Sequence, residues 1–202
     1  MKSTTNLDFN ELLGKKTIIY GEVNTGKTKF TAEFVRFLLE EKKIKPTEIS
    51  ILDFGPKLIE INGKKIGGRI IDFYPQSEIC DNIKLNGDII PPRLNAKSKE
   101  ELHKNAQHNY MITLKSLENF HSNPTPVLII NDISIYLHMG SETLLLEAIE
   151  QCETFLGNTY YGTLIKSQFD QAFSENEKRL VEKILKKIKF SYFTNKSGSN
   201  SS

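Results

Sequence analysis

One segment near the N-terminus combines glycines, a lysine and a threonine at a spacing that suits phosphate chemistry. It reads Gly21-Glu22-Val23-Asn24-Thr25-Gly26-Lys27-Thr28 and fits the pattern GxxxxGK[ST] at every position. Glycine lets the backbone curl so that successive N–H groups point at an anion. Lys27 would place its charge against the β- and γ-phosphates of a nucleotide, and the Thr28 hydroxyl would ligate Mg²⁺. The sequence therefore predicts a nucleotide site at residues 21–28 and Lys29, with Lys27 as its central catalytic contact.

The residues on either side of this segment have the patterns that such a site needs. Residues 17–20 form a short β-branched and aromatic run, which predicts a buried strand. From residue 27 to about 43, apolar residues recur at helical spacing. A helix that begins directly after the segment would present its positive end to the same anion. We therefore expect a strand, a phosphate-binding loop and a helix in direct succession.

Strand and helix patterns alternate along the rest of the chain. The predicted strands are 49–54, 127–130, 159–165 and 190–193, and the predicted helices are 99–120, 142–155 and 175–189. Residues 58–73 predict a β-hairpin that turns at Asn62-Gly63, and residues 75–98 predict a long surface loop. This alternation predicts a three-layer α/β fold with a mostly parallel sheet, helices on both faces and an added β-hairpin. Residues 1–193 would form one domain, and the Gly/Ser/Asn-rich residues 194–202 a disordered tail.

Residues 17–44 resemble the opening strand, Walker A loop and helix of the P-loop NTPases. The resemblance implies the three-layer fold of that superfamily and binding of ATP or GTP with Mg²⁺, together with hydrolysis or phosphoryl transfer. A GTP-specific protein of this kind would need an Asn-Lys-x-Asp motif. Asn195-Lys196-Ser197-Gly198 has glycine where the acid belongs, so we expect ATP.

P-loop NTPases also carry a carboxylate at the end of an apolar strand, where it holds Mg²⁺. The candidate here is the pair Asn131-Asp132, which follows the apolar residues 127–130. Two alignments are open. In the favoured one, Asp132 is the carboxylate at the metal. In the other, Asn131 occupies that place and Asp132 stands where many ATPases have a catalytic glutamate.

Two further positions resemble the RecA/KaiC-type ATPases. Asp53 closes the strand after the first helix, where that class has its general base, and Ser167-Gln168 follows the predicted strand 159–165, where that class senses the γ-phosphate. Both would lie beyond the carboxyl ends of the strands, where open α/β sheets bind ligands. Arg93 and Arg179 could contact phosphate as well, although a solvated surface position is favoured for each.

Composition narrows the possible partners and the compartment. The formal net charge is only +2, from 27 basic and 25 acidic residues, which gives no support to wholesale nucleic-acid binding without excluding it. No apolar run approaches the roughly 18 residues that would cross a bilayer. Cys80 and Cys152 are isolated, which suggests reduced thiols. We therefore expect a cytoplasmic protein that does not bind membranes.

Three functional hypotheses follow. The first is an Mg²⁺-dependent ATPase that couples hydrolysis to conformational change or assembly, with Asp53 orienting or deprotonating the attacking water. It would act with a protein partner or as a homo-oligomer. The second is a small-molecule kinase or other ATP-dependent transferase, with residues 75–98 as a lid and Arg93 at the transferred group. The third is a nucleotide-gated binding module without turnover.

Overall fold

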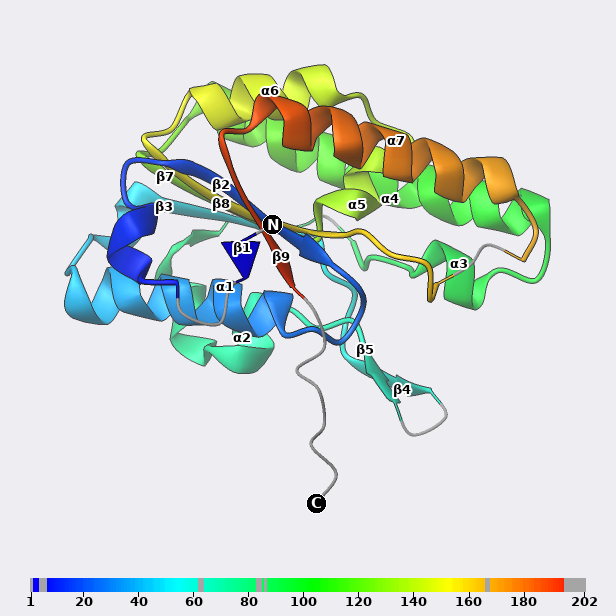
Figure 1. Cartoon of the computed structure of the whole chain (residues 1–202), viewed down its shortest axis with the longest axis horizontal. Coiled ribbons are helices and arrows are strands. Elements are labelled where there is room, and N and C mark those ends of the chain that lie inside the picture. The colour runs from blue at the N-terminus through cyan, green and yellow to red at the C-terminus, as the bar shows by residue number, and fades with distance from the viewer. Residues whose placement is uncertain are drawn as a thin grey trace.

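The chain forms a parallel β-sheet covered by helices on both faces (Figure 1). The computed structural model describes residues 2–3, 7–61, 64–82, 85, 87–165 and 168–194. Within these residues the sheet order is β1-β9-β2-β8-β7-β3-β6, and every neighbouring pair is parallel. The strands are β1 (Lys2–Ser3), β2 (Lys16–Gly21), β3 (Ile49–Asp53), β6 (Asp81–Asn82), β7 (Val127–Asn131), β8 (Thr154–Tyr160) and β9 (Phe190–Thr194). The predicted α/β class with a parallel sheet is confirmed.

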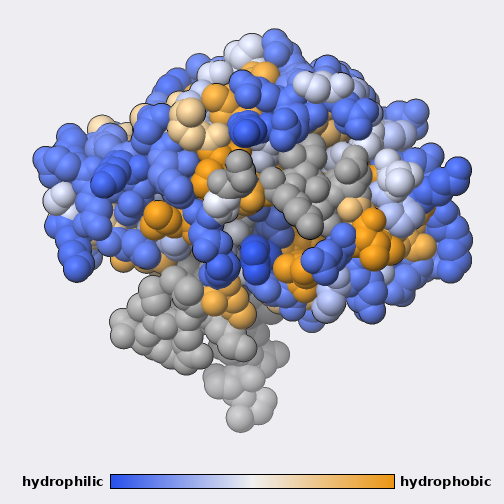
Figure 2. Space-filling model, turned by 180° about the vertical axis from the view of Figure 1, so that it is seen from behind, coloured by the Kyte–Doolittle hydropathy of each residue, from blue (hydrophilic) through white to orange (hydrophobic). Residues whose placement is uncertain are grey.

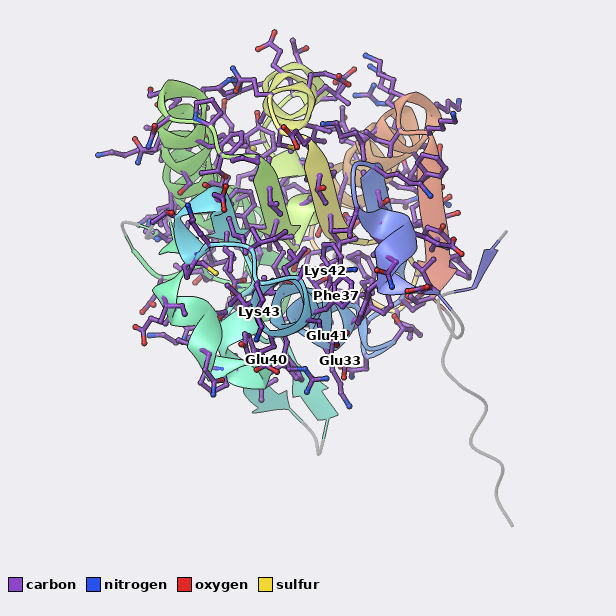
Figure 3. All side chains as sticks on the ribbon, turned by 90° about the vertical axis from the view of Figure 1, so that its left-hand side faces the viewer. Glu33, Phe37, Glu40, Glu41, Lys42 and Lys43 are labelled. Carbon is purple, nitrogen blue, oxygen red and sulfur yellow. The ribbon has the colours of Figure 1, made fainter. Side chains whose placement is uncertain are left out.

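The helices form two layers, which Figure 3 shows end-on with the sheet between them. One layer holds α1 (Lys27–Arg36), its π-helical continuation η3 (Phe37–Glu41), α2 (Ile70–Phe73) and η5 (Pro75–Ile79). The other holds α4 (Lys99–Ser122), α5 (Ile133–Leu137), α6 (Glu142–Glu150) and α7 (Gln171–Lys187). The short elements η2 (Phe9–Leu12), η4 (Pro46–Glu48) and α3 (Pro92–Asn95) lie in the connections.

The central strands are buried along almost their whole length because both faces of the sheet are covered. In β7, Leu128 and Ile130 belong to the core under α4, α6 and α7, while Ile129 between them belongs to the core under α1. All three side chains are 0% exposed. The sheet is thereby fixed on both sides, and its carboxyl edge becomes a rigid support for the loops that follow.

The predictions for residues 142–165 are wrong at their boundaries. The predicted helix 142–155 ends at Glu150, and the predicted strand 159–165 is β8, which begins at Thr154 and ends at Tyr160. The backbone N–H groups of Glu153 and Thr154 both donate to the carbonyl of Pro126, which draws this stretch into the sheet beside β7. The β-branched and aromatic residues that follow then continue the strand.

The hairpin prediction is confirmed in its first part only. Strand β4 (Ile59–Ile61) pairs antiparallel with β5 (Lys64–Ile66), and the predicted turn Asn62-Gly63 lies outside the described residues. The predicted extension of the second strand to residue 73 is wrong, because residues 70–73 form α2. Gly67 and Gly68, with φ of 83° and 122°, end the strand, since these backbone angles are open mainly to glycine.

Four other predictions also differ in part from the structure. Residues 75–98 are not one irregular loop, because they contain η5, β6 and α3. Helix 99–120 is confirmed and extends to residue 122, whereas α7 begins four residues before the predicted 175. Thr194, which the prediction assigned to the tail, is the last residue of β9, and residues 195–202 lie outside the described part of the chain.

The surface is mostly hydrophilic, as the rear view in Figure 2 shows. Hydrophobic side chains reach this surface in small, separate groups. The most exposed large ones among the described residues are Ile79 at 64%, Leu164 at 60% and Met111 at 58%. Single exposures of this kind are ordinary in globular proteins and do not by themselves mark a binding surface.

Candidate functional site

A cavity of about 520 Å³ opens at the carboxyl edge of the sheet. Residues 21–28, called the glycine loop below, contribute positions 23–28 to its wall, and α1 contributes Lys29. The ends of β7 and β8, helix α5, helix α3 and the base of the hairpin form the other walls. The carboxyl edge of a parallel sheet is where open α/β folds bind ligands, so this cavity is the candidate site.

The glycine loop is shaped by two backbone positions that need glycine. Gly26 has a φ of 81°, and it directly precedes the first residue of α1. Gly21 has a φ of 151°, and a Cβ there would lie 2.4 Å from the carbonyl oxygen of Thr194. Thr25 adds two hydrogen bonds, one to the carbonyl of Glu22 at 2.8 Å and one with the Thr194 hydroxyl at 2.7 Å. The end of β9 therefore supports the loop from behind.

The loop leaves a run of backbone donors unused. Residues 22–25 form a turn, but none of the N–H groups of residues 24–28 donates a hydrogen bond of normal length and angle to a described residue. They surround the start of α1, where the helix dipole concentrates positive charge. The first N–H groups of a helix have no acceptor within the helix, so this run, together with Lys27, offers donors and positive charge to an anion.

Lys27 lies folded over the same loop. Its ammonium donates to the carbonyl of Gly21 at 3.0 Å and to that of Glu22, and it lies 3.4 Å from the Thr25 hydroxyl. Burial lowers the pKa of Lys27 to about 8, while the charges of Asp132 and Glu22 oppose that shift. The ammonium is therefore partly desolvated, and its hydrogen bonds within the described part of the chain go to neutral oxygens, so an incoming anion would be a strong competing partner.

The pair at the end of β7 divides its contacts between the loop and the cavity. The Thr28 hydroxyl donates to the Asn131 side-chain oxygen at 3.2 Å, and Asn131 is 0% exposed. Asp132 lines the cavity in a left-handed conformation with φ of 57°, and its carboxylate accepts the Ser134 hydroxyl at 2.6 Å. Burial raises the pKa of Asp132, and the Ser134 bond and the Lys27 charge oppose that shift. Asn131 thus contacts Thr28, while Asp132 brings a carboxylate to the cavity.

Asp53 lies beside this pair but faces another way. Its two oxygens accept N–H groups from Ile70 at 2.6 Å, from the Asn131 side chain at 2.6 Å and from Gly55 at 3.2 Å. Burial raises the pKa of Asp53 to about 6, against the lowering effect of these hydrogen bonds. Asp53 lines a neighbouring cavity with Arg69, and it is not among the residues around the glycine-loop cavity.

The structure does not bring Gln168 to the cavity. Gln168 is exposed and lies eight positions beyond the end of β8, and Ser167 is outside the described residues. The polar residue near the end of β8 that does line the cavity is Asn158. Its side-chain nitrogen donates to Asn131 at 2.8 Å and to Thr31 at 3.0 Å. The run 154–160, correctly identified as a strand, would have pointed to Asn158.

A buried charged cluster forms the far wall of the cavity. The Arg93 side chain is 7% exposed and makes a 2.9 Å ion pair with Glu177, which is 3% exposed. His138, at 1% exposed, contacts the same carboxylate oxygen, Oε2, at 2.6 Å. The guanidinium also packs over the Tyr160 ring at 5.1 Å. The predicted surface position of Arg93 is wrong, whereas that of Arg179 is confirmed, because Arg179 is exposed.

The missed signal for this cluster is the position of Glu177 in its helix. It falls between Phe173 and Leu180 on the buried side of α7. A carboxylate on the apolar face of a helix needs a buried partner, and a buried arginine is the usual one. That pattern in the sequence indicates a buried ion pair without identifying Arg93 as the partner.

Glu22 ties the glycine loop to the segment after β8. Its carboxylate accepts the backbone N–H groups of Thr163 and Leu164. Gly162 makes room for this contact, since a Cβ there would lie 2.2 Å from the Glu22 carboxyl carbon. The middle of the pattern GxxxxGK[ST] is free in sequence, so the pattern alone does not predict this role.

Comparisons with known proteins add no identity to this site. A scan against models of protein families finds no match to the chain, and a search of curated proteins finds no similar sequence. None of the described helices is both long enough and apolar enough to cross a bilayer. The geometry of the glycine loop and its cavity is therefore what indicates the chemistry of this chain.

Proposed function

We propose that this chain is a P-loop nucleoside triphosphatase, which binds ATP with Mg²⁺ at the glycine loop and couples hydrolysis to conformational change or assembly. The observation that supports it most directly is the run of unused N–H groups at residues 24–28, which lies at the start of α1 beside Lys27. A triphosphate would supply the negative charge and the acceptor oxygens with which these N–H groups can form hydrogen bonds.

The residues around the loop fit both the phosphates and the metal. Thr28 and Asp132 would hold Mg²⁺, which supplies charge neutralisation for the phosphates when it is bound. The described residues contain no cluster of three or more His, Cys, Asp or Glu that could hold a metal alone. That agrees with a Mg²⁺ site, because Mg²⁺ typically takes one or two protein ligands and completes its shell with phosphates and water.

The transferase alternative gains no support from Arg93. That hypothesis gave its guanidinium to the transferred phosphoryl group, but the guanidinium contacts Glu177 and donates to the carbonyl of Ile165 at 3.3 Å. An arginine held this way supports the wall of the cavity. Hydrolysis with water is therefore the proposal that fits this cavity best.

The proposal is tested by titrating the protein with ATP in a calorimeter, with and without Mg²⁺, and by following phosphate release. We expect Mg²⁺-dependent binding and slow release of phosphate by the protein alone. Absence of nucleotide binding would overturn the proposal. Binding without release under any condition would overturn the hydrolysis part and leave a nucleotide-gated module.

Replacing Asp132 with asparagine tests the acid at the end of β7. The amide keeps an oxygen for Ser134 but removes the charge beside Lys27, so turnover should fall by about 100-fold. The two alignments of Asn131 and Asp132 predict different binding results. If Asp132 holds the metal, as we propose, ATP affinity in Asp132→Asn should no longer increase with Mg²⁺. Unchanged Mg²⁺ dependence with lost turnover would instead assign Asp132 to the attacking water. The exposed Asp88→Asn is the control.

Nucleotide binding should take up protons at alkaline pH. The free Lys27 ammonium has a pKa of about 8, and a phosphate beside it would raise that pKa. Because the bound state then holds the proton more tightly, ATP affinity should fall as pH rises above about 8, by at most about tenfold per pH unit. Calorimetry at pH 8.5 in two buffers of different ionisation enthalpy measures the uptake. Lys27→Arg should abolish the proton uptake because arginine does not titrate near pH 8.5. Equal binding heats in both buffers for the wild type would refute the predicted proton uptake.

A further inference from the structure

An unbroken chain of hydrogen bonds runs from the glycine loop to the base of the hairpin. The Thr28 hydroxyl donates to Asn131, the Asn131 amide donates to Asp53, and Asp53 accepts the N–H of Ile70. Ile70 is the first residue of α2. These four residues, called the relay below, therefore connect the proposed ligand contact at Thr28 to a different wall of the same cavity.

Asn131 is the central member, and its amide group is fully used. The oxygen accepts from Thr28 at 3.2 Å and from Asn158 at 2.8 Å. The nitrogen donates to Asp53 at 2.6 Å and to the carbonyl of Gly68 at 3.1 Å. A buried amide cannot lose one of these partners without leaving a buried polar group unsatisfied, which is unfavourable. Loss or movement of one hydrogen-bond partner of Asn131 should therefore alter its hydrogen bonds to the other three.

The far end of the relay is a segment that is anchored in the core by one buried side chain, Ile70, and is otherwise partly exposed. Residues 67–73, called the hairpin base, carry β5 into α2 and contribute Gly67, Gly68 and Phe73 to the cavity. Phe73 is 44% exposed, and its neighbour Leu58 is 42% exposed. Gly68 donates its N–H to the carbonyl of Pro56 at 3.0 Å. Because the residues on either side of Ile70 are partly exposed, the hydrogen bonds of Gly68 and Ile70 help to set the conformation of the hairpin base.

We propose that Asn131 and Asp53 are positioning residues that couple the occupancy of Thr28 to the conformation of the hairpin base. This inference rests on the proposed nucleotide function and identifies the hairpin base as the segment that changes conformation. When the Thr28 hydroxyl turns toward a ligand, the Asn131 oxygen loses that donor. The amide then shifts toward Asn158, and its nitrogen moves relative to Asp53 and Gly68. The hairpin, which Figure 1 shows projecting from the carboxyl edge of the sheet, moves with its base.

Hydrogen exchange of residues 67–73, measured by mass spectrometry with and without Mg²⁺ and ATPγS, tests the relay. In the wild type we expect ATPγS to change exchange in this segment by about fivefold. Asp53→Asn should bind ATPγS within about threefold of the wild type but lose the exchange change. The asparagine would offer one acceptor oxygen in place of two. Its amide N–H groups would then face the N–H of either Asn131 or Ile70, and two donors cannot form a hydrogen bond.

Two further variants separate coupling from a merely structural role. Glu48→Gln is the matched control, because Glu48 accepts the N–H of Lys45 at the start of η4 and does not line the cavity. It should keep the ligand-dependent change. The double variant Asp53→Asn with Asn131→Asp restores the contact with donor and acceptor exchanged, and should regain part of the change. This double variant carries the test if Asp53→Asn alone does not fold.

The outcomes distinguish this inference from the proposed function. If the wild type does not bind ATPγS, the proposed function fails and the relay fails with it. If it binds ATPγS and exchange at residues 67–73 stays the same, only the relay is overturned. The relay is also overturned if Asp53→Asn retains the full wild-type change.

Discussion

Replacing Lys27 with alanine is expected to lower ATP turnover by about 100-fold or more and to weaken ATP binding about tenfold. The ammonium is the one charged donor that the glycine loop itself directs over its own carbonyls, at 3.0 Å from Gly21. Without it, the N–H groups of residues 24–28 would remain to bind phosphate, but charge developing in the transition state would lose its nearest cation. Phosphate release under saturating ATP and Mg²⁺ measures the first effect, and calorimetry measures the second.

Lys42→Ala is the matched control for this experiment. Figure 3 labels Lys42 with Phe37 and Glu41 at the end of the helix that is opposite to the glycine loop. Its ammonium lies 5.3 Å from the centre of the Phe37 ring, and the residue is exposed. We expect wild-type turnover from Lys42→Ala. Equal turnover in Lys27→Ala and the wild type would show that the glycine loop is not the catalytic site.

Replacing Arg93 with alanine is expected to lower the free energy of unfolding by about 3–5 kcal/mol. The substitution would leave the Glu177 carboxylate, 3% exposed, without its cation and with only the His138 ring beside it. It would also remove the contact with the Tyr160 ring and the hydrogen bond to Ile165. Urea denaturation followed by circular dichroism measures the loss.

Two variants make the interpretation of this loss specific. Arg179→Ala removes an exposed arginine from the same helix as Glu177 and should change stability by less than about 0.5 kcal/mol. Adding Glu177→Gln to an Arg93→Met background removes the unpaired charge and should recover a large part of the lost stability. A loss in Arg93→Ala no greater than in Arg179→Ala would refute the buried ion pair.

Local patterns predicted the elements near the glycine loop well. Strand β2 and the start of α1 follow from the apolar run before Gly21 and the helical spacing after Lys27. Both signals act over a few residues and are reinforced by the tight backbone of the loop itself. The parallel sheet could also be predicted, because the alternation of strand and helix patterns is likewise visible in short stretches of sequence.

The parts of the site that depend on distant contacts could not be obtained this way. The segment that contains Asn158 is a strand because β7 and β2 flank it, and helical spacing through Phe155 hid that fact. Arg93 looks like a solvated residue in a proline-rich stretch until α7 places Glu177 against it. Local propensity is overridden when tertiary partners supply the missing hydrogen bonds or charge.

The position of β2 in the sheet also determines how late in protein synthesis the glycine-loop site can form. Strand β2 emerges early, but its two neighbours are β8 and β9, which come last in the described chain. Thr194, at the end of β9, contacts both Gly21 and Thr25. Such long-range parallel pairing is slow, because loop closure must precede any gain from the contacts. A nascent chain that already contains the whole glycine loop therefore lacks the final shape of that loop, and with it the proposed phosphate site, until β9 has been synthesised and docked.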